Sequence, residues 1–193
     1  MQSAKFLFCP QCGSPLNETV IADQLRKNCP ACSFVYWGEF SLGVGGVIWQ
    51  ENKVLLVERA NDPGKGLWTI PGGYVDHGEQ IYEAVKREVL EETGLKAEPQ
   101  SLIALWDWPG NKHMLYVVFL MHQTGGKLQA DPTEVSNLGF YTIEECRRIN
   151  ITDLSLSVVR TSYENRTGLN RTNEIKLIGN ITTLYQVDGN PLL

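Results

Sequence analysis

Three carboxylates crowd the end of one predicted helix. Apolar residues recur at helical spacing in residues 81–93, and Gly94 follows where the helix would end. The apolar face runs into Glu88, Glu91 and Glu92, whose i,i+3 and i,i+4 pairs repel by about 0.2–0.5 kcal/mol each. The negative end of the helix dipole disfavours each anion by about 0.3–1 kcal/mol more. A divalent cation such as Mg²⁺, which takes oxygen ligands and keeps positions for a substrate phosphate, would offset this repulsion.

The basic residues of the same helix do not supply the obvious counter-charge. On a helical projection, Lys86 and Arg87 point away from the centre of the carboxylate cluster. Arg87 lies instead in an i,i+4 series with Glu83 and Glu91. A bound cation is one interpretation of the cluster, and a solvated acidic helix end is the other. The helix alone does not decide between them.

The composition favours a soluble, cytoplasmic protein. The chain has 193 residues and a formal net charge of −5, which suits one medium domain or a small domain joined to a medium one. The N-terminal residues lack the apolar run of a signal peptide, and no stretch reaches the roughly 18 apolar residues of a membrane span. The acidic balance argues against a broad basic surface for nucleic acid.

Four of the five cysteines form two Cys-x-x-Cys pairs. Cys9 and Cys12 form the first pair, Cys29 and Cys32 form the second, and sixteen residues separate them. This spacing is typical of a tetrahedral Zn²⁺ site with four thiolate ligands. Two disulfides are the alternative, which a cytoplasmic location disfavours. We expect residues 1–38 to form a zinc ribbon that is too short to build its own core and therefore depends on the metal.

The rest of the chain reads as strands interrupted by helices. The expected elements are two strands within residues 42–59, a short strand within 61–73, the acidic helix, strands at 100–110 and 113–126, a strand entering a helix at 138–149, and a long helix at 153–165 with Leu154, Val158 and Tyr163 inward. Strands on both sides of a central helix, with another helix near the end, predict an α/β/α sandwich over residues 39–165. The sequence assigns no role to the extension 166–193.

The acidic helix and the loop before it resemble a known motif. Gly73, five residues, Glu79, seven residues and then residues 87–95, "REVLEETGL", resemble the Nudix box, G-x5-E-x7-R-E-U-x-E-E-x-G-U with U aliphatic. Every fixed position of the motif is filled. The resemblance implies a Nudix hydrolase with the Nudix α/β/α sandwich fold, which cleaves a nucleoside diphosphate linked to another group, X, by attack of water on phosphorus.

The cysteine pairs restrict the resemblance to Nudix proteins that carry a four-cysteine ribbon before the Nudix domain. A four-cysteine ribbon before a Nudix domain resembles NADH pyrophosphatases and a shorter group that includes FAD and ADP-ribose pyrophosphatase-like proteins. The S-Q-P-W-type motif of the first group is absent after the box, so the chain is more similar to the shorter group. Pro109, fifteen residues beyond Gly94, is a placement associated with ADP-ribose pyrophosphatases, although turns favour proline in any case.

The resemblance implies roles for the residues of the box. Glu88, Glu91 and Glu92, with the backbone carbonyl of Gly73, are the implied ligands of Mg²⁺ or Mn²⁺, and one of the glutamates could also act as base. Arg87 is implied to orient the glutamates through ion pairs. Glu79 is implied to help Arg87 from the start of the helix. A purely structural role is the alternative for Glu79, because its position suits the positive end of the helix dipole.

Candidates also lie outside the box. Glu134 occupies the place of a loop glutamate that some relatives use as base or extra ligand, and a plain surface acid is the alternative. Arg59 and Lys65 could meet phosphates, and an exposed lysine without such a role is the alternative for Lys65. Trp106 and Trp108 share one side of a predicted strand and could stack on a nucleobase. Core packing is the alternative for both tryptophans.

Three functions remain to be compared. The first is a metal-dependent pyrophosphatase whose partner is a small-molecule nucleotide such as FAD, ADP-ribose or an NADH-like substrate. The others are a zinc-ribbon nucleic-acid-binding or nucleotide-sensing regulatory module, and an RNA-cap pyrophosphatase. Residues 1–38 carry three basic side chains, Lys5, Arg26 and Lys27, and two acidic ones, Glu18 and Asp23, with no basic stripe. This small excess of positive charge disfavours both nucleic-acid functions. The sequence leaves a homodimer open.

Overall fold

The computed structural model describes residues 6–110, 112–164 and three short strands at 170–171, 175–177 and 180–186. The chain divides into two units, Met1–Phe40 and Ser41–Leu193. Within the described part of the chain, no helix has the length and apolar composition that a membrane crossing requires.

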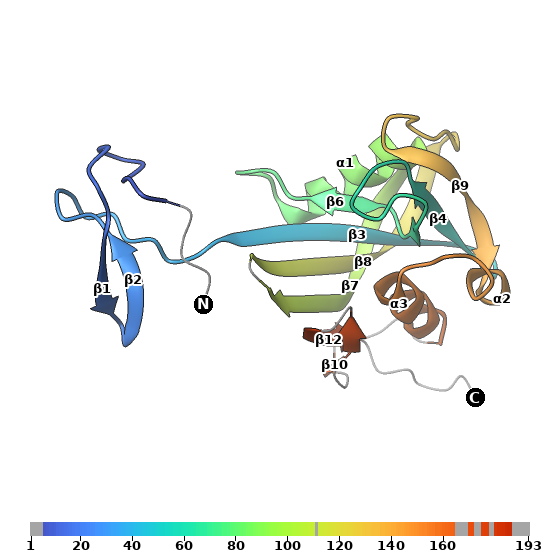
Figure 1. The fold of residues 1–193 in the computed structure, drawn as a ribbon. Helices are drawn as coiled ribbons and strands as arrows, with labels where there is room; N and C mark the ends of the chain where they lie inside the picture. The colour runs from blue at the N-terminus through green and yellow to red at the C-terminus, as the bar shows by residue number, and fades with distance from the viewer. Residues whose placement is uncertain (1–5, 111, 165–169, 172–174, 178–179, 187–193) are drawn as a thin grey trace. The chain divides into compact units, whose positions relative to one another are not determined.

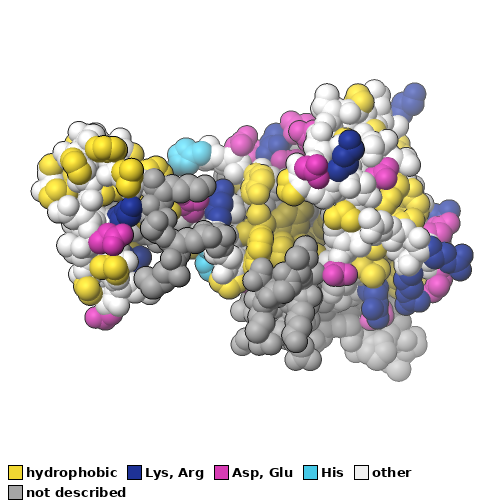
Figure 2. Space-filling model, in the orientation of Figure 1, with side chains coloured by type: hydrophobic (Ala, Val, Ile, Leu, Met, Phe, Trp, Pro, Cys, Tyr) yellow, Lys and Arg dark blue, Asp and Glu magenta, His cyan; other side chains and the backbone are white. Residues whose placement is uncertain are grey.

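The N-terminal unit is a hairpin flanked by the cysteine pairs. Strands β1 (Asn17–Ile21) and β2 (Gln24–Asn28) pair in antiparallel register. Ala22 and Asp23 both have positive φ, as the right-handed twist of a two-residue hairpin turn requires. Among residues 6–40, Cys9 and Cys29 alone are buried, and hydrophobic side chains gather on the surface of the unit (Figure 2). The described residues of this unit, 6–40, therefore form no apolar core of their own.

The second unit is built around one sheet (Figure 1). Its strand order is β10-β12-β7-β8-β3-β4-β5, with β6 paired to β3 and β9 paired to β4. The bounds are β3 Phe40–Gln50, β4 Lys53–Arg59, β5 Trp68–Thr69, β6 Gly72–Tyr74, β7 Leu95–Pro109, β8 His113–Gly126 and β9 Val135–Thr142, followed by β10 Asn170–Arg171, β11 Ile175–Leu177 and β12 Asn180–Gln186.

Two helices cover opposite faces of this sheet. Helix α1 (Ile81–Thr93) buries Ala84, Val85 and Val89 in one apolar cluster, whereas α3 (Asp153–Glu164) buries Val158 and Val159 in another. Strand β4 lies between the clusters, because its alternate side chains enter different ones: Val54 and Leu56 join α3, and Leu55 joins α1. The predicted α/β/α sandwich is thus confirmed. The short α2 (Ile143–Cys146) connects β9 toward α3.

Two details differ from the sequence prediction. Strand β7 begins at Leu95, five residues before the expected start, and register shifts at Lys96/Ala97 and Pro99/Ser101 accommodate the proline that obscured its pattern. The expectation that Tyr163 faces inward was wrong, because the buried face of α3 is centred on Ser155, Val158, Val159 and Ser162, and Tyr163 lies at the edge of that face with 45% exposure.

The extension 166–193 lies partly outside the described residues. Its strand β12 pairs antiparallel with β7, from Thr183 opposite Asp107 to Gln186 opposite Ala104. The extension therefore adds β12 to the sheet beside the segment of β7 that carries Trp106, with β10 on the other side of β12.

Candidate active site and cysteine cluster

Helix α1 presents two carboxylates from a buried position. The helix ends at Gly94, which adopts φ 70° and donates its N–H to the Leu90 carbonyl. A side chain at Gly94 would meet the Lys127 carbonyl at 2.4 Å, so only glycine fits this stop. One turn apart on the helix, Glu88 and Glu92 are each only 8% exposed. Packing of the apolar face thus forces these two carboxylates, but not Glu91, against the sheet.

Strand β6, which precedes the helix, supplies the opposite wall of the site. The Gly72 N–H donates a hydrogen bond of 2.8 Å to Glu92 Oε2. A Cβ atom built on Gly73 would lie 2.6 Å from the carboxyl atoms of Glu88, so Glu88 packs directly on the backbone of Gly73. The two glycines therefore let the main chain approach both carboxylates more closely than any other residue type would.

Arg87 binds three carboxylates of the site and one backbone carbonyl of β6. Its guanidinium donates two hydrogen bonds to Glu79 at 2.8 and 2.9 Å, and Nη1 donates to Glu88 Oε1 at 2.8 Å and to Glu91 Oε2 at 3.1 Å. Nη2 also donates to the Tyr74 carbonyl at 3.1 Å. The hydrogen bonds from Arg87 lower the pKa of Glu79 to about 2.

The predicted orientation of Arg87 was therefore wrong. The helical projection located its Cα–Cβ direction and ignored the reach of the long side chain, which folds back across the cluster. The expected partner Glu83 pairs instead with Lys86, which also binds Glu98.

Burial makes the charged forms of the two inner carboxylates unfavourable. It raises the pKa of Glu92 to about 8, and it also raises the pKa of Glu88. Nearby negative charges, including that of Glu134, raise the pKa of both carboxylates further. Oxygen donors, negative charge and a close backbone approach are the features that Mg²⁺ or Mn²⁺ needs, so the residues fit a divalent cation.

Two residues from outside the box come near these carboxylates. The charge of Arg59, at the end of β4, lowers the pKa of Glu92, and its Nε donates to the Pro63 carbonyl at 3.0 Å. Glu134 lies in the loop before β9, and its carbonyl accepts the Ala60 N–H at 2.9 Å. That bond holds the Glu134 loop beside the end of β4. Lys65 is exposed in the loop before β5.

The two tryptophans of β7 stack on each other. Their ring centroids are 5.7 Å apart and their planes differ by 5°. Trp106 packs against the cluster that α3 covers, and its indole N–H is buried without a hydrogen-bond partner in the described part of the chain. Trp108 is partly exposed at the end of the strand. The pair thus combines one packed ring with one accessible ring.

Tyr116, which faces Trp106 across the β7–β8 pair, was not among the residues predicted from the sequence. A side chain at Gly43 would approach its ring to 2.5 Å, and side chains at Gly45 and Gly72 would meet its hydroxyl at 2.7 and 2.6 Å. Tyr116 therefore fills the space that three glycines leave next to the site. The alternating glycines of "GVG" in β3 were the available signal, because glycine in a strand interior often marks a close approach.

The four cysteines of the N-terminal unit converge. Their sulfur atoms all lie within 4.8 Å of one another, with Cys9 and Cys32 at 3.6 Å and Cys12 and Cys29 at 3.4 Å. All four are free thiols, and the sulfurs of a tetrahedral zinc site with bonds of about 2.3 Å would lie about 3.8 Å apart. Backbone N–H groups two residues beyond Cys9 and Cys29 donate to their sulfurs at 3.4 Å. The cluster could therefore hold a metal ion.

Comparisons with known proteins agree with this geometry. An ADP-ribose pyrophosphatase of Methanocaldococcus jannaschii is 41% identical over 93 residues, which are 47% of this chain and 55% of that protein. The NAD-capped RNA hydrolase NudC of Chromobacterium violaceum is 31% identical over 137 residues, which are 71% of this chain and 50% of that protein. The chain thus spans about half the length of these curated relatives.

A solved structure and a family match extend the comparison. The crystal structure of a NUDIX hydrolase from Nitrosomonas europaea has a TM-score of 0.74 and 26% identity, and the match covers 83% of this chain and 92% of that chain. Residues 39–160 match the NUDIX domain family. Since this region is more than half of the sequence and contains the whole carboxylate site, the chain belongs to the Nudix family.

Proposed function

We propose that the chain is a metal-dependent pyrophosphatase that hydrolyses a nucleoside diphosphate linked to a second group. The observation that carries this proposal is the placement of two buried carboxylates, Glu88 and Glu92, against the backbone of Gly72 and Gly73. A purely structural role does not account for two buried carboxylates whose pKa values burial raises.

The residues would divide the work as follows. Glu88, Glu91, Glu92 and the Gly73 carbonyl would hold Mg²⁺ or Mn²⁺, which when bound offsets charge on the phosphates and lowers the pKa of water. Arg87 would orient Glu88 and Glu91, since it already binds both. Arg59 would contact a phosphate, and Glu134 would accept the proton of the attacking water. The water oxygen bonds to one phosphorus as the bridging P–O bond breaks, which leaves two phosphate monoesters.

The ring pair suggests the substrate class. Trp108 is partly exposed at the end of β7, and its indole ring suits stacking on the adenine or flavin ring of ADP-ribose, FAD or an NADH-like dinucleotide. The name of the Methanocaldococcus jannaschii relative supports ADP-ribose. The name of the NudC relative, which matches 71% of this chain, supports NAD-capped RNA as a second candidate. We also propose that the four cysteines bind one Zn²⁺ and that residues 1–38 and 39–165 act as ribbon and catalytic domain.

A substrate panel tests the proposal. FAD, NADH, ADP-ribose, dinucleoside polyphosphates and NAD-capped RNA would each be incubated with Mg²⁺ or Mn²⁺, and the products would be identified by chromatography. We expect AMP from ADP-ribose or FAD, with slower cleavage of capped RNA. Failure of every diphosphate in the panel with both metals would contradict the proposed function.

Substitution of the tryptophans separates substrate binding from packing. We expect Trp108→Ala to remove a stacking surface and to weaken binding by about 1–3 kcal/mol, which appears mainly as a raised KM with little change in kcat. Trp106→Ala should instead lower the melting temperature, because its ring packs against the core. Lowered melting of both variants with unchanged KM values for FAD and ADP-ribose would assign both rings to packing.

Gly73→Ala tests the contact between the backbone of β6 and Glu88 on α1. The added methyl group would overlap the Glu88 carboxyl at 2.6 Å and displace one proposed metal ligand. We expect kcat to fall at least about tenfold, a loss of about 1.4 kcal/mol in transition-state stabilisation. Gly125→Ala is the matched control, because a side chain there meets nothing within 4 Å. Equal activities of the two variants would exclude this role of Gly73.

A further inference from the structure

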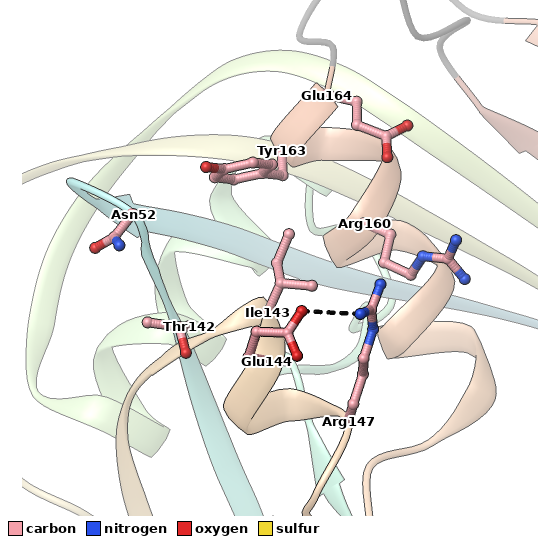
Figure 3. Close-up of a pocket in the computed structure, with 8 residues that line it drawn as sticks. All are labelled: Asn52, Thr142, Ile143, Glu144, Arg147, Arg160, Tyr163 and Glu164. Carbon is pink, nitrogen blue, oxygen red and sulfur yellow. Dashed lines mark hydrogen bonds and ion pairs between the residues drawn. The ribbon is translucent and has the colours of Figure 1, made fainter.

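A second pocket lies outside the carboxylate site. Its volume is about 380 Å³, within the range of about 300–1,000 Å³ that small-molecule sites occupy. Three segments line it (Figure 3): the β3–β4 turn, α2 with the residue after it, and the last turns of α3. The lining residues are Asn52, Thr142, Ile143, Glu144, Arg147, Arg160, Tyr163 and Glu164.

The pocket is far from the proposed catalytic residues. Asn52 precedes β4, whereas Arg59, whose charge acts on Glu92, ends it. A strand of seven residues spans about 20 Å at about 3.3 Å per residue. No small nucleotide could occupy both places at once, so any ligand of this pocket is a second ligand.

The pocket lining carries two arginines and two glutamates, so its formal charges balance, and the case for an anion rests on where the guanidinium groups lie. Two arginines line it: the Arg147 side chain reaches toward Glu144, and Arg160 extends outward from α3 (Figure 3). Arg147 pairs with Glu144 at 2.9 Å, and Arg160 has no carboxylate at ion-pair distance in the part of the chain that is described. An exposed guanidinium with a second one beside the same cavity suits a phosphate group, because each presents paired N–H donors in a plane.

An aromatic ring lies in the same pocket. Tyr163 is 45% exposed, and its ring packs at 5.4 Å on Trp49. Trp49 is fixed in turn, since its indole N–H donates to Ser162 Oγ at 3.2 Å and Ser162 is buried. The ring therefore stands in place before a ligand arrives, which lowers the entropy cost of binding.

The acidic wall is also ordered. Thr142 and Glu145 form a capping box at the start of α2, which fixes the backbone that carries Glu144 and Arg147. With Glu144 engaged by Arg147, the remaining lining acid is Glu164 at the end of α3. The pocket thus places two guanidinium groups and one aromatic ring around the same cavity.

We propose that this pocket binds a nucleoside monophosphate, with its phosphate on Arg160 and Arg147 and its base against Tyr163. The pocket exists whether or not the proposed hydrolysis occurs, so the inference stands apart from the catalytic proposal. AMP is the probe, and its binding is measured without turnover.

The test is an NMR titration of the ¹⁵N-labelled, zinc-loaded full chain with AMP, adenosine and inorganic phosphate, without added Mg²⁺. We expect AMP to shift the amide signals of Asn52, Glu144 and Tyr163 along one saturable curve. Adenosine and phosphate should each bind at least tenfold more weakly, because each lacks one half of the recognised group. Shifts confined to Gly72, Gly73 and α1, or equal binding of adenosine and AMP, would overturn the proposal.

Variants assign the binding to the pocket. Arg160→Gln should raise the Kd for AMP at these signals at least tenfold, and Tyr163→Leu should weaken AMP binding without changing phosphate binding. Arg148→Gln is the matched control, since this exposed arginine follows Arg147 but does not line the pocket. Glu92→Gln should retain AMP binding at this site. Equal losses in Arg148→Gln and Arg160→Gln, with unchanged melting curves, would contradict the assignment.

Discussion

Glu92→Gln is expected to lower kcat at least about a hundredfold while the fold stays as stable or becomes more stable. The amide would replace an anionic oxygen that we propose as a ligand of the catalytic cation. The Gly72 N–H could still donate to the amide oxygen, because the side chain keeps its shape. Burial raises the pKa of Glu92 to about 8, so its charged form is destabilised in the folded chain and a neutral group relieves that penalty.

Glu91→Gln provides an independent arm of the same prediction. Glu91 is more exposed and is held by Arg87 at 3.1 Å, so its loss should spare stability and lower kcat by a similar factor. Glu83→Gln is the control, since Glu83 lies on the same helix and pairs with Lys86 outside the cluster. Steady-state kinetics at saturating Mg²⁺ and thermal melting would be measured for all three. Near-normal turnover of both Glu91→Gln and Glu92→Gln would refute the metal-ligand assignment.

Removal of zinc is expected to unfold the N-terminal unit while the Nudix domain stays folded. Residues 6–40 bury only two side chains, Cys9 and Cys29, and both are proposed ligands. Without an apolar core, the folded state must draw its stability from the metal, and structural Zn²⁺ contributes about 10–16 kcal/mol in small domains of this kind. The purified chain should carry one Zn²⁺, and chelation or Cys12→Ser should collapse the amide dispersion of residues 6–40.

The control and the readout separate the two units. Cys146→Ala should keep the zinc, because Cys146 lies in α2 and belongs to the core of the second unit. Amide signals of β3, β4 and α1 should persist after chelation. Elemental analysis without zinc, or a dispersed spectrum of residues 6–40 after complete removal of the metal, would contradict the prediction. A four-thiolate site leaves no open position for water, so no catalytic role is expected.

The sequence predicted those parts of the site that depend on local spacing. The i,i+4 relation of Glu88 and Glu92 and the helix end at Gly94 are properties of one helix, so the sequence alone could predict them. The four-cysteine group could be predicted for the same reason, since each Cys-x-x-Cys pair is a local pattern in the sequence. The α/β/α layers followed from the order of strands and helices.

The parts that depend on contacts across the sheet could not be predicted. Tyr116 reaches the site because glycines from β3 and β6 leave room for its ring, and no local pattern relates those three segments. The predicted orientation of Arg87 was wrong because it ignored two acceptors before the helix, the Tyr74 carbonyl in β6 and Glu79 in the loop that follows, both of which bind the Arg87 side chain. The early start of β7 depended on bulges that absorb Pro99.

Binding of Mn²⁺ to the carboxylate site tests the central claim most directly. Electron paramagnetic resonance of free Mn²⁺ would be recorded during titration of the zinc-loaded chain, of Glu88→Gln and of the control Glu83→Gln. Our account predicts saturable binding that Glu88→Gln weakens at least about tenfold, since Glu88 is a buried carboxylate packed on Gly73. Glu83→Gln should match the unsubstituted chain. Equal Mn²⁺ affinity of Glu88→Gln and the unsubstituted chain would contradict the account.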